Sequence, residues 1–162
     1  MTTVIGIDAS LTGTGIARIT LDPFTIATHT ISSAGKKGAT LDQRATRLRK
    51  LRDTIIDHAT PADLVLIEGP TYGSSTGSVW DRAAHWWNLV GTLHHLGIPV
   101  VEVAPARAKK FACGVGSGPK SGKVAVAAGL TKLWGDHVSP DDDNQFDALA
   151  LATIGGVGLW SA

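Results

Sequence analysis

The chain has 162 residues, of which 43% are hydrophobic and 18% charged, and its formal net charge is +1. This composition excludes a disordered chain and is typical of a single globular domain spanning residues 1–162. The one cysteine, Cys113, excludes an intrachain disulfide framework and a cysteine-based zinc site. From the single cysteine we expect a reducing, cytoplasmic setting. No apolar run reaches the roughly 18 residues that a membrane span needs, so we expect no membrane partner.

Charge is distributed unevenly along the chain. Residues 103–135 carry six Lys or Arg residues and no acid, whereas residues 136–147 carry five aspartates and no Lys or Arg. Such segregation suits a polyanion-binding surface beside an acidic metal pocket. A second basic cluster lies between Lys36 and Arg52, and it fits a solvated helix face equally well.

The hydrophobic pattern predicts that the chain opens with three antiparallel strands. The first strand, Thr3–Asp8, is almost filled by apolar residues, which is typical of a strand buried on both faces. The segment Thr12–Gly15 predicts a tight turn in which Gly13 and Gly15 supply unusual dihedral angles. Strands Gly15–Leu21 and Phe24–Ile31 complete the meander.

Helices and further strands alternate in the remainder of the chain. Helices are predicted at Thr40–Ala59, Val79–Leu96, Pro105–Ala112, Lys120–Trp134 and Asn144–Ile154, strands at Asp63–Glu68 and Ile98–Val103, and a tail at Gly155–Ala162. This order predicts an α/β fold with a central mixed five-stranded sheet, in which three antiparallel strands are followed by parallel ones and helices cover both faces.

Several acidic residues stand at the ends of apolar elements. Asp8 and Glu68 each end a buried strand, and Asp147 lies on the last predicted helix, where Asp143 and Asn144 share its face. A single carboxylate at a strand end is usually a cap or an ion-pair partner. Gathered carboxylates repel one another, and Mg²⁺ relieves that repulsion, with Mn²⁺ as a substitute. Two such ions about 4 Å apart can cleave a phosphodiester.

With these motifs in place, the chain resembles the RuvC family of Holliday junction resolvases in the RNase H-like superfamily. The similarity runs through nearly the whole chain in the family's order. It rests on residues 5–15 (IGIDASLTGTG), 66–68 (LIE), 105–109 (PARAK), 114–121 (GVGSGPKS) and 147–152 (DALALA). The resemblance implies an RNase H-like fold and a nuclease active on branched DNA. The compact length would suit a phage-encoded member.

The resemblance also implies metal ligands at Asp8, Glu68 and Asp147. The family has Asp or His three residues before its last aspartate, where this chain has Asn144. Either Asn144 is a neutral, weaker ligand, or Asp143 takes the role from the preceding position. We favour Asp143, because an amide cannot replace the missing charge.

The family's basic segment implies DNA contacts. Lys109 and Lys120 are expected near the scissile phosphate, with Lys120 stabilising the charge that develops there. The aromatic that stacks on bases at the crossover corresponds to Tyr72, which could instead pack on its own domain. The expected DNA-binding cations are Arg107, Lys109, Lys110, Lys120 and Lys123.

Family members are dimers, because two symmetric nicks need two sites related by a two-fold axis, so we expect a homodimer. Trp80 and Trp87 share one face of a predicted helix, either in the core or in such an interface.

The leading hypothesis is a Mg²⁺-dependent endonuclease that resolves Holliday junctions by paired nicks. Other branched DNA, or an RNA precursor, are alternative substrates within the same class. A catalytically weak junction-binding protein is a further alternative, which Asn144 would permit. Sugar kinases and actin-like ATPases share the superfamily topology, but they need a second comparable domain to close over ATP.

Overall fold

The computed structural model describes residues 2–70 and 79–160. Its five strands form one sheet in the order β3-β2-β1-β4-β5. β1 pairs antiparallel with β2, and β2 with β3, whereas β4 is parallel to both β1 and β5. The predicted mixed sheet is therefore confirmed.

The secondary-structure elements follow the predicted order. The strands are β1 (Thr3–Asp8), β2 (Gly13–Leu21), β3 (Phe24–Ser32), β4 (Leu64–Glu68) and β5 (Val100–Val103). The helices are α1 (Leu41–Ala59), α2 (Val79–His95), α3 (Pro105–Cys113), α4 (Lys123–Trp134) and α5 (Asp143–Trp160), and a short 3-10 helix, η1 (Pro119–Ser121), precedes α4.

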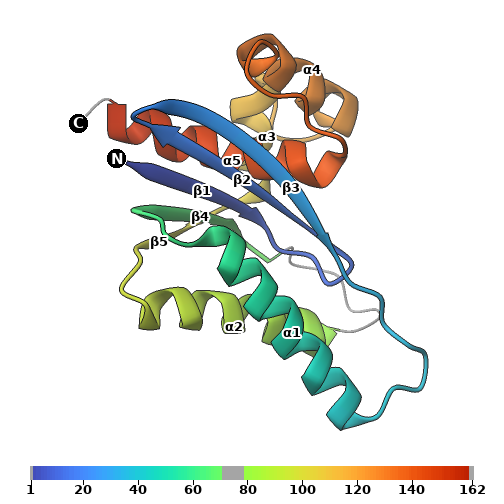
Figure 1. Ribbon diagram of the computed structural model, residues 1–162. Helices are drawn as coiled ribbons and strands as arrows, with labels where there is room; N and C mark the ends of the chain where they lie inside the picture. Colours follow the sequence, from blue (N-terminus) through green and yellow to red (C-terminus); the bar gives the residue numbers. More distant parts are fainter. Residues whose placement is uncertain (1, 71–78, 161–162) are drawn as a thin grey trace.

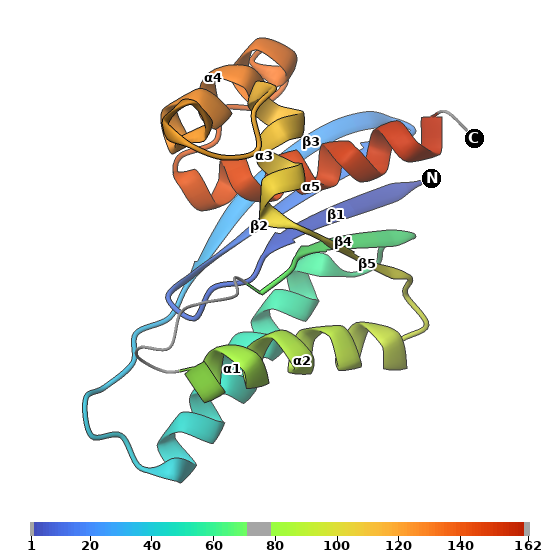
Figure 2. The same ribbon diagram turned by 180° about the vertical axis from the view of Figure 1, so that it is seen from behind.

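The helices cover both faces of the sheet, as predicted. α5 lies across one face with α3 and α4 beside it, and α1 and α2 cover the other (Figures 1 and 2). Because neighbouring residues of a strand point to opposite faces, Val4 enters the core beneath α5 while Ile5 enters the core beneath α1 and α2. None of the helices in the described part combines the length and apolar content that a membrane crossing requires.

Close packing of α5 on the sheet explains two glycines near the start of the chain. A β-carbon at Gly6 would lie 2.0 Å from the Ala148 carbonyl oxygen, and one at Gly15 would lie 1.9 Å from that of Asn144. The predicted turn at Thr12–Gly15 is wrong, because Gly13 and Gly15 both lie in β2, and neither has the positive φ that a turn glycine can tolerate. Gly15 instead lets a helix backbone approach the strand.

Other predicted boundaries are also wrong. β5 begins at Val100 rather than Ile98. β2 begins at Gly13 rather than Gly15, because Gly13 already pairs with Ser32 of β3. The predicted helix at Lys120–Trp134 is divided, with η1 ending at Ser121 and α4 starting at Lys123. The residues after Ile154 were expected to form a tail, but α5 continues to Trp160.

Candidate active site

Two carboxylates emerge side by side at one edge of the sheet. Asp8 ends β1 and Glu68 ends β4, and these strands are parallel neighbours with Ile7 opposite Ile67. Parallel strands present their carboxyl ends at the same edge, so the register that pairs the two isoleucines brings the next residues together. The two carboxyl groups lie close enough for each to affect the pKa of the other.

The third carboxylate comes from α5. The first turn of this helix lies directly on β2, because Asn144 meets Gly15, and Gly15 is the residue that pairs with Asp8. Asp147 follows Asn144 by just under one helical turn. The contact between α5 and β2 therefore sets Asp147 over the strand end that carries Asp8.

Asp142 fixes the start of α5, a role that the sequence interpretation missed. Its Oδ1 accepts from the Gln145 backbone N–H at 2.9 Å, which is an N-cap hydrogen bond, and its Oδ2 accepts from the Thr30 hydroxyl on β3 at 2.7 Å. The Gln145 side chain accepts from Thr28 of the same strand at 2.7 Å. An aspartate three residues before a glutamine, at the start of a helix, is a signal that could have identified this cap.

The pKa values of all three carboxyl groups are raised, and burial is the largest cause for each. Burial raises the pKa of Asp8 to about 8, and the charges of Glu68 and Asp147 add to the effect. Burial and the charge of Asp147 raise the pKa of Glu68, partly offset by Lys109. The pKa of Asp147 is raised by burial, which Lys109 and Lys123 oppose. Lys109 and Lys123 therefore do not fully balance the negative charge that the three acids carry when all are ionised.

A hard divalent cation would supply the missing charge. Carboxylate oxygens are the ligands that Mg²⁺ prefers, so the chemistry of the donors fits such an ion. Within residues 2–70 and 79–160, however, no three His, Cys, Asp or Glu side chains form a ready metal-binding group. The donors are thus gathered at one edge without forming a completed coordination shell.

The two candidates for the fourth ligand face different surroundings. The Asp143 charge raises the pKa of Asp147, so it acts on the acidic group, and its Oδ2 lies 2.9 Å from the Lys123 ammonium. The Asn144 side chain lies against β2, where a β-carbon at Gly13 would be 3.0 Å from its amide nitrogen. The surroundings of Asp143 keep it the favoured candidate.

The predicted basic residues divide into two groups. Lys109 of α3 and Lys123 of α4 lie close enough to act on the pKa values of the carboxylates. Lys120 lies on η1, exposed to solvent, and its ammonium forms no ion pair with any described residue. Arg107 and Lys110 are exposed on α3. The predicted base-stacking residue, Tyr72, falls outside the described residues.

Trp86 supports the site from α2, which the sequence interpretation also missed. Its indole Nε1 donates to the Glu68 carbonyl oxygen at 2.8 Å, so it holds the end of β4. Trp86 and Glu68 line a hollow of about 500 Å³ on this side of the sheet. The two other tryptophans of the helix, Trp80 and Trp87, are 82% and 65% exposed, so neither belongs to the core of this chain.

Comparison with solved structures places this architecture among known folds. Thermus thermophilus RuvC in complex with a Holliday junction substrate matches with a TM-score of 0.75 and 15% identity, over 100% of this chain and 97% of that one. A second structure of that RuvC gives a TM-score of 0.75 and 16% identity, over 99% and 96% of the two chains. The yeast mitochondrial Holliday junction resolvase gives a TM-score of 0.60 and 14% identity, over 94% and 76%.

These matches define the class of fold. The chain has the RNase H-like α/β fold that occurs in Holliday junction resolvases. Within that class its fold is that of RuvC, which confirms the fold that the sequence motifs implied. No family model matches the sequence, and no curated protein does.

Proposed function

We propose that this chain is a divalent-metal-dependent endonuclease that resolves four-way DNA junctions. The observation that carries the proposal is the meeting of Asp8, Glu68 and Asp147 at one edge of a sheet with the RuvC fold. These carboxylates come from three elements that are far apart in the sequence, and their mutual repulsion would weaken the fold if they had no ligand to bind. Thermus thermophilus RuvC, which shares the fold, has been observed with a Holliday junction substrate.

The proposed cofactor is a pair of Mg²⁺ ions, for which Mn²⁺ would substitute. When bound, such a pair supplies an activated water and a counter-charge for the leaving oxygen. Asp8, Glu68 and Asp147 would hold the ions. Asp143 would complete the set, in preference to Asn144.

The basic residues would bind and orient the DNA backbone. Lys109 and Lys123 lie near the carboxylates, which suits them to the phosphate that is to be cut. Lys120 is proposed to stabilise the charge that develops there, and it would have to approach from η1 when DNA is bound. Arg107 and Lys110, on the exposed side of α3, would contact flanking phosphates. The proposed base-stacking role of Tyr72 completes this set.

The proposed functional unit is a homodimer. Resolution of a junction requires a nick in each of two opposing strands, and a two-fold axis provides two equivalent sites for that purpose.

Cleavage of a synthetic four-way junction tests the proposal. With Mg²⁺ present, the wild-type protein should nick opposing strands, and Asp8→Asn should bind the junction but cut it at least about a thousand-fold more slowly, since it removes a central metal ligand. A junction without Mg²⁺ is the control. Equal cutting by Asp8→Asn would contradict the proposed site. Flaps, forks and a structured RNA, tested in parallel, would show whether the four-way junction is the preferred substrate.

A further inference from the structure

A second hollow lies beside the acidic edge, on the side of the sheet covered by α1 and α2. It has a volume of about 740 Å³. Its walls are the loop of residues 34–39, the first turns of α1, the start of α2, and the β1–β2 connection at Leu11 and Thr12. Figure 1 shows that this loop extends away from the sheet to reach the start of α1.

The wall of this hollow carries several positive charges, and only one of them forms an ion pair with a described residue. Lys36 and Lys37 line it, both exposed, and neither forms an ion pair with any residue in the described ranges. Arg44 also lines it, but Asp81 neutralises that charge through a hydrogen bond of 3.0 Å from the Arg44 Nε. The remaining cation is Arg47.

Arg47 is held in place by neutral groups alone. Its Nε donates to the Ser33 hydroxyl at 2.8 Å, and its Nη2 donates to the Leu11 carbonyl oxygen at 2.6 Å. Its Nη1 faces the loop, where a β-carbon at Gly35 would lie 2.6 Å away. The guanidinium is therefore fixed in orientation and forms no direct ion pair with a described carboxylate, although the Asp81 charge, already paired with Arg44, also acts on it. A guanidinium held this way can still bind an anion.

The protein interior behind Arg47 supplies no counter-charge. His85 of α2 is 1% exposed, and neither ring nitrogen has a hydrogen-bond partner among the described residues. Burial, with the Arg47 charge adding to it, lowers the pKa of His85 to about 4, so the ring is neutral near pH 7. His85 therefore contributes no charge that would offset Arg47, which lines the hollow.

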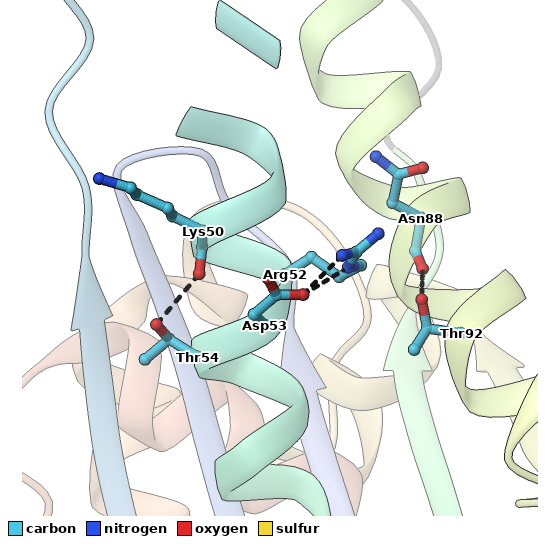
Figure 3. Close-up of polar contacts among 6 residues, drawn as sticks. All are labelled: Lys50, Arg52, Asp53, Thr54, Asn88 and Thr92. Carbon is cyan, nitrogen blue, oxygen red and sulfur yellow. Dashed lines mark hydrogen bonds and ion pairs between the residues drawn. The ribbon is translucent and has the colours of Figure 1, made fainter. Parts of the chain in front are cut away.

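The basic cluster at residues 36–52 thus has two halves of different character. Its first half lines the hollow. In its second half, the Arg52 guanidinium forms an ion pair with Asp53 at 2.6 Å. The Thr54 hydroxyl donates a hydrogen bond to the Lys50 carbonyl oxygen, as Figure 3 shows. That second half is an ordinary solvated helix face.

An exposed aromatic side chain completes the hollow. Trp80, at the start of α2, lines it and is 82% exposed. An exposed indole next to unpaired cations is the combination that binds single-stranded nucleic acid, because the ring stacks on a base while the cations bind the phosphates.

The hollow is close to the proposed catalytic edge. Leu11 follows Asp8 by three residues, so their α-carbons are at most about 11 Å apart. Val79 lines this hollow and also the smaller one that Glu68 lines. A DNA strand with one phosphate at the carboxylates would reach the hollow within a few nucleotides.

We propose that this hollow is a second nucleic-acid site, in which Lys36, Lys37 and Arg47 bind a phosphate and Trp80 stacks on an unpaired base of the same strand. The site rests on the proposed function, since its ligand is the branched DNA that the carboxylates would cut. It would select branched DNA over an intact duplex, because only a splayed strand has a base free to stack.

Binding of a fluorescent four-way junction in Ca²⁺ buffer, measured by anisotropy over a range of salt, tests the proposal. The variants are Lys36→Gln/Lys37→Gln and Trp80→Ala, with Lys132→Gln on α4 as a matched charge control. We expect affinity to fall by about five- to thirty-fold for Trp80→Ala. For the double variant, the log–log salt slope should become shallower by about 1 for each lost phosphate contact. Trp80→Phe should retain most of the affinity.

The outcomes separate this proposal from the proposed function. If the wild-type protein binds and cuts the junction while both variants bind as tightly as Lys132→Gln, the hollow is not a nucleic-acid site, although the function stands. If the wild-type protein binds no junction, both proposals fail. If Trp80→Ala loses affinity only because it dissociates into monomers, as sedimentation would reveal, Trp80 belongs to a subunit contact and the stacking site is overturned.

Discussion

The two faces of the sheet are built in different ways. On one face, α5 packs so closely on β1 and β2 that a β-carbon at Gly6 or Gly15 would overlap its backbone. On the other face, α1 and α2 pack through larger side chains such as Ile55 and Leu89, and hollows open at their edges. Close backbone packing leaves few alternative positions for α5, and α5 carries Asp147. The closely packed face therefore sets the position of Asp147, whereas the open face leaves the hollow that we propose binds DNA.

The largest expected effect is on the closely packed face. Gly6→Ala should lower the free energy of unfolding by about 3 kcal/mol or more, because the new methyl group would meet the Ala148 carbonyl oxygen and the Ala152 nitrogen, and neither can move unless α5 shifts. Gly91→Ala, on α2, is the control: its β-carbon would meet nothing within 4 Å, so it should stabilise the protein by up to about 1 kcal/mol. Urea unfolding measures both. Equal changes in the free energy of unfolding for the two variants would contradict the difference in packing between the two faces.

The next effect is the loss of folding stability that the burial and mutual repulsion of the gathered carboxylates cause. The pKa of Asp8 is raised from 3.8 to about 8. A folded-state pKa above the unfolded value means that the folded state binds more protons between those two values, so metal-free stability should fall as the pH rises from about 4 to 8. Asp8→Asn, which mimics the protonated acid, should therefore be more stable than wild type at pH 8 by on the order of 2 kcal/mol.

Thermal unfolding in EDTA as a function of pH measures this difference. The gap between Asp8→Asn and wild type should close toward pH 4 and should shrink when Mg²⁺ is added at pH 8. An identical pH profile for the two proteins would show that the site imposes no electrostatic cost.

An effect of similar size is expected at the start of α5. Asp142→Ala should cost about 2 kcal/mol, because it removes the N-cap hydrogen bond and the bond to Thr30. Asp141→Ala is the matched control: the Asp141 side chain is exposed, and only its backbone N–H contacts Gln145, so the change should stay within about 0.5 kcal/mol. Cleavage should also slow in Asp142→Ala. If Asp142→Ala and Asp141→Ala have the same free energy of unfolding, the Asp142 cap does not hold α5 in place.

The smallest effect is expected at the exposed ion pair between Lys123 and Asp143. The two side chains are 73% and 47% exposed, so Lys123→Gln should change stability by less than about 1 kcal/mol. Removing a cation beside the carboxylates should nevertheless strengthen Mn²⁺ binding by about two- to five-fold. Calorimetric titration measures that affinity, with Lys132→Gln as the control. Weaker Mn²⁺ binding would show that Lys123 supports the site instead of competing with the metal.

Local pattern was enough to predict most elements. β1 was predicted with its observed bounds, and β4 and α2 within one residue, because buried strands and amphipathic helices have periodicities that a sequence displays directly. The end of α5 was missed for a physical reason. Gly155 and Gly156 are weak helix formers, but Gly155 packs against Val4 and Leu66, and this tertiary contact outweighs the local preference.

The sequence by itself determined which residues are the candidates for the chemistry. Acids placed at the ends of apolar strands, and a long basic segment without acids, remain visible without coordinates because they depend on residue type and local spacing. The α/β class and the mixed sheet followed from the order of the elements, and the RNase H-like fold from the resemblance of the motifs to the RuvC family.

Only the tertiary structure decided how these groups meet. It brought Lys109 and Lys123 to the carboxylates, assigned Asp142 to a cap, and divided the basic cluster at residues 36–52 into a solvated half and a half that lines a hollow. The physical reason is that electrostatic and packing contacts depend on distances across the sheet. Those distances are set by the close approach of α5 to β2 at Gly15, which the chain order alone could not reveal.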